Sequence, residues 1–157
     1  MSFALVCERL CALAAGPGVP GFGYLRANAA GSVVAARHIG GLAAPRYAAA
    51  CPLWALFRAQ QVPESVVRQR VLFPDGNRFV FVARAGLSGP VGFGRARHYL
   101  TDMLVMTEDA AASTVYAADG FVPVEPVGIA CRSCARRDCI HRVADPLGAE
   151  SPGGATA

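Results

Sequence analysis

The stretch SVVRQRVLFPDGNRFVFVAR, residues 65–84, predicts a β-hairpin. Two runs rich in β-branched and aromatic residues lie on either side of a polar turn, as expected of two β-strands. The turn contains Pro74, Asp75 and Gly76. Proline presets φ, aspartate hydrogen-bonds to nearby backbone and glycine permits positive φ, so each residue favours a tight connection.

Two other regions also have strand patterns. Residues 23–27 and 33–39 flank a turn-like segment and predict another hairpin, and residues 99–106 predict one long strand. Residues 85–95, AGLSGPVGFGR, match no nucleotide-binding fingerprint and predict a flexible loop. Because the hairpins follow one another without crossover helices, we expect an α+β domain with a mainly antiparallel sheet of about five strands.

Helices are predicted in three places. Residues 3–15 have apolar positions at helical spacing before Gly16 and Pro17. A second helix is expected from Pro52 onward, because proline is tolerated in the first turn of a helix. Residues 107–118 predict a third helix, with the Thr107 hydroxyl as its N-cap.

The composition predicts one folded domain. The chain has 157 residues, of which 54% are hydrophobic and 17% are charged, as expected for a globular protein with a single core. We expect residues 1–147 to form this domain and the small, polar residues 148–157 to form a disordered tail.

Charge and hydropathy bear on nucleic-acid binding, export and membrane insertion. The net charge is +4 and all 15 basic residues are arginine, with no dense basic run or aromatic-basic motif of the kind that binds nucleic acid. The apolar amino terminus is interrupted by Glu8 and Arg9, unlike a signal peptide, and the longest apolar stretch is broken by prolines. We therefore expect a cytoplasmic protein that does not span a membrane.

The segment CRSCARRDCIH, residues 131–141, has the spacing of a metal site. Cys131 and Cys134 form a C-x2-C pair, and Cys139 follows. A fourth ligand would be either Cys51 or His141, because tetrahedral zinc and four-iron clusters both need four ligands. Structural zinc, an iron–sulfur cluster and an accidental or disulfide-forming group all fit this spacing. Nearby arginines favour ionised thiols, and they are Arg132, Arg136, Arg137 and Arg142.

Several segments together carry a family resemblance. PVGIACRSCARRDCIHR, with YLRANAAGSV, ACPLWALF, FPDGNRFVFVAR and VYAADG, resembles the carboxy-terminal sensor domain of the short-chain fatty acyl-CoA transcriptional regulators. These regulators control propionate, acetate and glyoxylate-pathway genes. The resemblance implies a non-enzymatic domain that senses coenzyme A or a short-chain acyl-CoA and carries a [4Fe–4S] cluster.

The resemblance also implies which cysteines are ligands. Cys51, Cys131, Cys134 and Cys139 match the cysteines of the family, whereas His141 stands where the family usually has glutamine. The resemblance therefore favours a [4Fe–4S] cluster over zinc, with zinc as the alternative metal.

A coenzyme A ligand needs cations for its phosphates and an apolar slot for its acyl chain. The candidates for the phosphates are Arg37, Arg46, Arg58, Arg70, Arg84 and Arg97, and those near the slot are Trp54, Phe57, Phe79 and Tyr99.

The sequence departs from the family in one respect that bears on partners. Members normally carry a helix-turn-helix and a segment with H-E-x-x-H, and neither is found in these 157 residues. We expect a fragment or a stand-alone sensor that makes no direct contact with nucleic acid and acts as a homodimer or through a partner regulator. The alternative function is a zinc-stabilised protein-interaction module without a small-molecule ligand. No pattern of catalytic residues indicates an enzyme.

Overall fold

The structure is a computed structural model of the chain. It describes residues 2–13, 21–42, 44–45, 49–89, 92–94, 96–117 and 122–147. The predicted tail, residues 148–157, lies outside the described residues.

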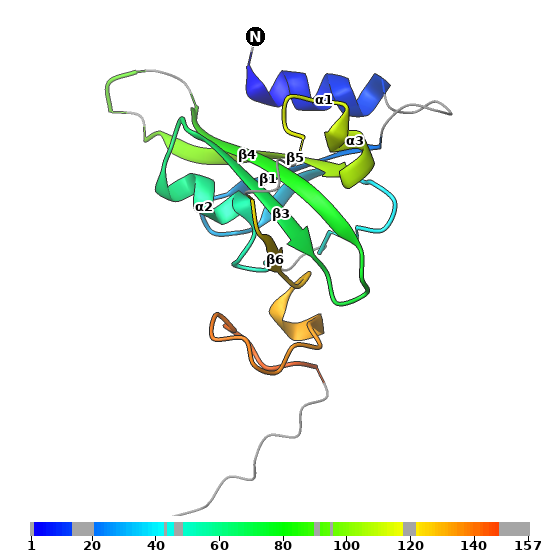
Figure 1. Cartoon of the computed structure of the whole chain (residues 1–157). Coiled ribbons are helices and arrows are strands. Elements are labelled where there is room, and N and C mark those ends of the chain that lie inside the picture. The colour runs from blue at the N-terminus through cyan, green and yellow to red at the C-terminus, as the bar shows by residue number, and fades with distance from the viewer. Residues whose placement is uncertain are drawn as a thin grey trace, which may run out of the picture.

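One mixed β-sheet forms the centre of the domain (Figure 1). Its strands run in the order β2-β1-β5-β4-β3-β6, and all neighbouring strands are antiparallel except β3 and β6. The predicted α+β class with a mainly antiparallel sheet is confirmed, and the parallel strand β6 adds a sixth, unpredicted strand. The strands are β1 (Phe22–Asn28), β2 (Val33–Arg37), β3 (Val66–Leu72), β4 (Arg78–Ser88), β5 (His98–Thr107) and β6 (Val124–Pro126).

The hairpin predicted from residues 65–84 is formed by β3 and β4. Their register runs from Val66 opposite Arg84 to Leu72 opposite Arg78. Gly76 has φ 87°, so the turn uses the positive φ that glycine adopts without strain. Strand β4 continues to Ser88, and the first part of the predicted loop 85–95 is therefore strand.

Helices cover both faces of the sheet (Figure 1). Helices α1 (Phe3–Leu13) and α3 (Glu108–Ala112) lie on one face, and α2 (Ala55–Gln61) lies on the other. Helix α2 begins later than expected from Pro52, because Trp54 is its N-cap and has extended backbone with ψ 146°.

The prediction that the third helix reaches residue 118 was wrong, because α3 ends at Ala112. The Thr107 hydroxyl does cap it, accepting a hydrogen bond from Ala110 N–H at 3.1 Å. Beyond Ala112, the Thr114 hydroxyl donates to the Ala111 carbonyl at 2.9 Å and accepts from Tyr116 N–H at 3.1 Å. These local bonds compete with continued helix.

The larger core lies between α2 and the sheet. Trp54 is fully buried there and its ring makes edge contacts with Phe73 and Phe81, with centroids 6.0 and 5.5 Å away. On the opposite face, Cys7 of α1 packs with Tyr24 in a second buried cluster. None of the described helices is long and apolar enough to cross a membrane.

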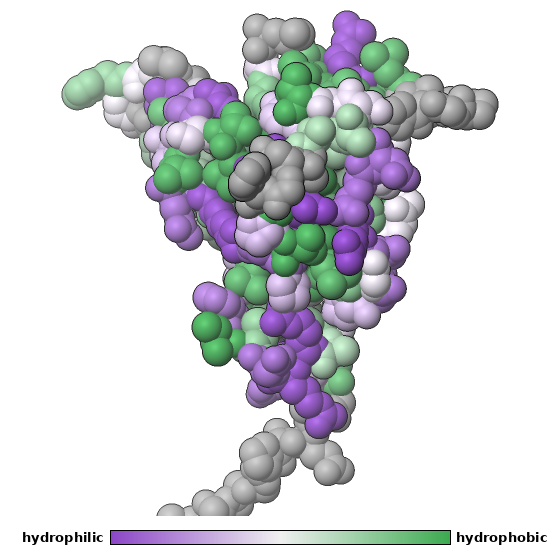
Figure 2. Space-filling model, viewed as in Figure 1, coloured by the Kyte–Doolittle hydropathy of each residue, from purple (hydrophilic) through white to green (hydrophobic). Residues whose placement is uncertain are grey.

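The chain after β6 leaves the sheet and forms a protruding end of the molecule (Figure 1). It contains one short 3-10 turn, η1 (Cys131–Ser133), and is otherwise irregular. Hydrophilic residues gather over this end (Figure 2). The cysteine-rich segment is thus placed beside the larger core by β6 and the residues that follow it.

Candidate metal centre

Two segments that are far apart in the sequence meet at the end of the sheet. The backbone N–H of Cys51 donates to the Ile129 carbonyl at 2.8 Å, and the Trp54 N–H closes a turn onto the Cys51 carbonyl at 3.1 Å. Ile129 lies just before η1, which begins at Cys131. A direct backbone bond therefore holds the Cys51 turn against the segment that carries the three clustered cysteines.

All four predicted cysteine ligands line one small pocket. Cys51, Cys131, Cys134 and Cys139 surround a volume of about 10 Å³. Each of these cysteines is a free thiol. The other residues that line the pocket are Pro52, Ala130, His141 and Arg142.

The pocket brings the thiols together without setting them in the geometry of a bound ion. Among the described residues, no group of three or more His, Cys, Asp or Glu side chains is placed closely enough to hold a metal ion. The volume of about 10 Å³ leaves room for about one water molecule. The identity of the ligand set therefore stays a prediction, which the shared pocket supports.

Cys51 has the environment of a buried sulfur that accepts hydrogen bonds. Burial raises the pKa of its thiol above the ordinary value, although backbone N–H groups of Gly128 and Leu53 donate to the sulfur and oppose this effect. The nearby Cys131 and Cys134 thiols raise the pKa further when they are ionised. A positive charge at this position would stabilise the Cys51 thiolate against both desolvation and repulsion by the other thiolates. A bound metal ion supplies such a charge.

Gly128 allows the two cysteine-bearing segments to approach closely. A Cβ built on Gly128 would lie 2.6 Å from Cys134 Sγ and 3.1 Å from Cys134 Cβ. Real Cβ atoms essentially never approach another heavy atom within 3.0 Å. The absence of a side chain at Gly128 is therefore what lets Cys134 pack against this backbone.

Trp54 supports the same backbone from the core side. Its indole Nε1–H donates to the Gly128 carbonyl at 2.8 Å. Because both groups are buried, the bond satisfies a carbonyl that would otherwise lack a partner. Trp54, predicted near an acyl slot, is in fact a fully buried core residue that positions the cysteine segment.

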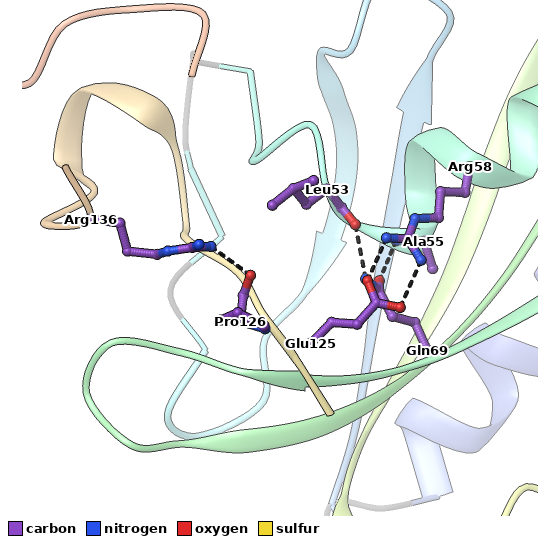
Figure 3. A network of polar contacts seen from close by, with 7 residues as sticks. All are labelled: Leu53, Ala55, Arg58, Gln69, Glu125, Pro126 and Arg136. Atoms are coloured by element: carbon purple, nitrogen blue, oxygen red, sulfur yellow. Dashed lines mark hydrogen bonds and ion pairs between the residues drawn. The ribbon is translucent and has the colours of Figure 1, made fainter. Parts of the chain in front are cut away.

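A polar network joins α2, β3 and β6 beside the pocket (Figure 3). Arg58 of α2 forms a two-pronged ion pair with Glu125 of β6, with one N–O distance of 2.8 Å. The buried Gln69 amide donates to Glu125 at 3.0 Å and to Leu53 O at 2.9 Å. Its oxygen accepts from Ala55 N–H at 2.7 Å. The network fixes the beginning of α2 relative to the strand that leads into the cysteine segment.

This ion pair also sets the charge state of Glu125. The hydrogen bonds from Arg58 hold the pKa of the Glu125 carboxyl below its ordinary value, and the Gln69 amide adds to this effect. No local pattern in the sequence marks Glu125 or Gln69, because their pairing depends on the parallel register of β6 beside β3.

Two arginines stabilise the irregular cysteine segment itself. Arg136 donates to the Pro126 carbonyl at 2.7 Å, as drawn in Figure 3. Arg142 lines the cysteine pocket and donates to several backbone carbonyls of the segment. The predicted effect of these cations on thiol ionisation stays a prediction, and the structure adds a role in holding backbone.

The residues predicted for coenzyme A do not share one pocket. Three of the arginines are paired: Arg58 with Glu125, Arg70 with Glu108 at 2.9 Å, and Arg84 with Glu64.

The remaining candidates are also separate from one another. Arg37 and Arg97 are exposed, and Arg46 lies outside the described residues. Phe79 is buried, like Trp54, while Phe57 and Tyr99 pack at the edge of the core. The coenzyme A site stays a prediction without a common location for these residues.

A larger cavity, missed by the sequence-based prediction, adjoins the cysteine pocket. Its volume is about 430 Å³, and it shares Ala130 and Cys131 with that pocket. No local pattern marks it, because its walls come from three separate parts of the chain. They are Ala49, Ala50, Ala130, Cys131, Arg132, Val143 and Ala144.

Comparison with known proteins identifies the family. The family model described as the short-chain fatty acyl coenzyme A regulator, C-terminal, matches residues 14–152. The chain belongs to this family. The match includes all four candidate cysteine ligands, β1 to β6 and the described residues of the protruding end. The resemblance seen in the sequence motifs is thereby confirmed.

Relatives of this short-chain fatty acyl-CoA regulator domain are named as regulators. The propionyl-CoA carboxylase regulator of Cereibacter sphaeroides is 36% identical over 135 residues, which cover 83% of this chain and 28% of the relative. The HTH-type transcriptional regulator PrpR of Mycobacterium tuberculosis is 28% identical over 154 residues, which cover 94% of this chain and 32% of the relative.

A solved structure shows the same fold. A Mycobacterium tuberculosis transcriptional regulator superposes with a TM-score of 0.79 at 26% identity, covering 96% of this chain and 47% of that chain. The chain spans about a third of the length of the curated relatives it matches. The comparisons thus define this chain as the carboxy-terminal domain of the short-chain fatty acyl-CoA regulator family.

Proposed function

We propose that this chain is the effector-sensing domain of a cytoplasmic transcriptional regulator of short-chain fatty acid metabolism. We further propose that it holds a [4Fe–4S] cluster on Cys51, Cys131, Cys134 and Cys139. The observation that carries this proposal is that all four cysteines line one pocket. Strands β3 to β6 separate Cys51 from the other three cysteines along the chain. The domain itself is proposed to be non-enzymatic.

The donor set fits a [4Fe–4S] cluster without a histidine ligand. His141 lines the pocket, but four thiols are already present without it, and four cysteines complete the coordination of a [4Fe–4S] cluster. Backbone N–H groups directed at the Cys51 sulfur are of the kind that tune the potentials of such clusters. When bound, the cluster would supply a redox-responsive link between the Cys51 turn and the protruding end.

Metal analysis of anaerobically purified protein tests this proposal. We expect iron and sulfide in equal amounts, with four of each per chain. One zinc per chain would replace the cluster by the alternative metal, because four thiolates also satisfy tetrahedral zinc. A fully folded protein without metal would refute the site.

We propose the cavity of about 430 Å³ as the place of the effector's acyl end. Its volume falls in the range of roughly 300–1,000 Å³ that is usual for small-molecule sites. Alanine and valine line it, which suits an aliphatic chain. Arg132 also lines it and is exposed, and its guanidinium forms no hydrogen bond or ion pair with the described residues, which suits the anionic groups of coenzyme A.

Thermal unfolding with coenzyme A, acetyl-CoA and propionyl-CoA tests the effector. A ligand that binds the native state must raise the melting temperature by mass action. We expect a larger rise with the acylated forms than with coenzyme A, and a smaller rise in the Ala144→Phe variant, whose ring would fill the cavity. No shift at millimolar ligand would favour the alternative function, a zinc-stabilised protein-interaction module.

A further inference from the structure

Arg142 is the centre of the hydrogen bonding in the cysteine segment. Its Nη1 donates to the carbonyls of Cys131 at 2.8 Å and Ala144 at 3.2 Å. Its Nη2 donates to the carbonyl of Cys134 at 3.2 Å and to that of Arg136. One guanidinium therefore ties together four backbone carbonyls, two of which belong to candidate cluster ligands.

The segment has few other bonds that could fix its shape. Its backbone bonds are mostly short-range turns, such as Ser133 N–H to Ala130 O at 3.1 Å and Arg142 N–H to Cys139 O at 3.1 Å, and one longer bond runs from Leu147 N–H to Arg132 O at 2.8 Å. A planar guanidinium presents five donors in a fixed fork. It thus supplies these carbonyls with the hydrogen-bond donors that a helix or sheet would otherwise supply.

Arg142 also places a positive charge at the pocket of the four sulfurs. The residue lines the same pocket as the four cysteines and is only partly exposed. It forms no ion pair with any described carboxylate. A cluster on four thiolates carries net negative charge that increases on reduction, so an uncompensated cation beside it stabilises the reduced form more than the oxidised form.

We propose that Arg142 is a positioning residue for the cluster, with two separable effects. Its fork holds the backbone of Cys131 and Cys134 so that both thiols face Cys51, and its charge raises the reduction potential. This inference rests on the proposed cluster site and adds to it a residue that contributes no ligand atom.

Three variants separate the fork from the charge. Arg142→Lys keeps the charge but removes the planar fork, and Arg142→Gln removes both. Arg137→Gln is the matched control, because Arg137 is a neighbouring cation that is exposed and has no hydrogen-bond or ion-pair partner in the described part of the chain.

The readouts are the rate of iron release to a chelator and the midpoint potential of the cluster. We expect both Arg142 variants to release iron about 10- to 100-fold faster, the usual effect of removing a group that orients metal ligands. Only Arg142→Gln should also lower the potential, and the control should match the wild type in both. Equal rates and potentials in Arg142→Gln and Arg137→Gln would overturn the proposal.

Hydrogen exchange of the reduced, metal-free protein tests the fork independently of metal identity. The amides of Ser133 and Cys134 should exchange faster in Arg142→Gln than in Arg137→Gln, and equal exchange would overturn the positioning effect. If the wild type holds zinc, the cluster proposal fails while zinc release from the same variants still decides whether Arg142 positions the ligands. A protein that binds neither metal would overturn both proposals.

Discussion

Replacing Gly128 with alanine should weaken metal binding without altering any candidate ligand. The new Cβ would lie 2.6 Å from Cys134 Sγ. Gly128 has no room to retreat, because its carbonyl accepts from Trp54 at 2.8 Å and its N–H donates to the sulfur of Cys51. Cys134 must therefore give way.

The required movement is large on the scale of a metal site. Reaching the closest approach of 3.0 Å from a contact of 2.6 Å demands a shift of at least 0.4 Å. Metal–ligand distances tolerate only about 0.2 Å. The atom that must move is the end of the Cys134 side chain, so we expect only a small loss of folding stability, but we expect metal release to become about 10- to 100-fold faster, as when a ligand loses its orientation.

Gly86→Ala is the matched control. A Cβ there would lie 3.7 Å from Glu64 Oε1, an ordinary contact. Both replacements remove the same backbone freedom from the unfolded chain, so their difference isolates the contact with Cys134. The assays are metal content after anaerobic purification, release to a chelator and denaturant unfolding. If Gly128→Ala kept its metal as well as Gly86→Ala, the close approach would not matter to the site.

Two further predictions concern the ligand set and the network beside it. Cys51→Ser should lower metal content as much as Cys134→Ser, whereas His141→Gln should leave it unchanged; loss of metal in the histidine variant would contradict the four-cysteine site. Because the ion pair with Arg58 lowers the folded-state pKa of Glu125, its stabilisation is present above the ordinary pKa of 4.5 and disappears as the pH falls. Denaturant unfolding should therefore show wild type more stable than Glu125→Gln at neutral pH, with the difference shrinking in acid; a constant difference would contradict the ion pair.

Strand pairing was predictable wherever a local pattern set it. The residue 65–84 hairpin follows from its β-branched and aromatic runs and from turn chemistry, and the structure pairs Val66 through Leu72 with β4 accordingly. Strand β6 (Val124–Pro126) has only three residues, too few for a strand pattern to be recognised in the sequence. It becomes a strand only because β3 offers it an open edge, and short segments have little intrinsic preference.

The residues of the candidate site also differ in whether a local sequence pattern marks them. The spacing of Cys131, Cys134 and Cys139 was readable, because ligands on one turn keep a fixed separation in sequence. The contributions of Gly128 and Arg142 were not readable, since they depend on contacts between segments that fold together only in the tertiary structure.

By itself, the sequence determined the α+β class, the hairpin and a thiol-rich segment whose predicted metal site would take either Cys51 or His141 as its fourth ligand. The tertiary structure decided that Cys51 stands at that segment, through its backbone bond to Ile129 and the parallel placement of β6. It also decided which partners the arginines have: Arg58 pairs with Glu125, whereas Arg142 donates hydrogen bonds to backbone carbonyls of the cysteine segment. The physical reason is that turns and strand patterns depend on residues close together in the sequence. The pocket, in contrast, is lined by segments that are distant in the sequence and meet only when the core packs.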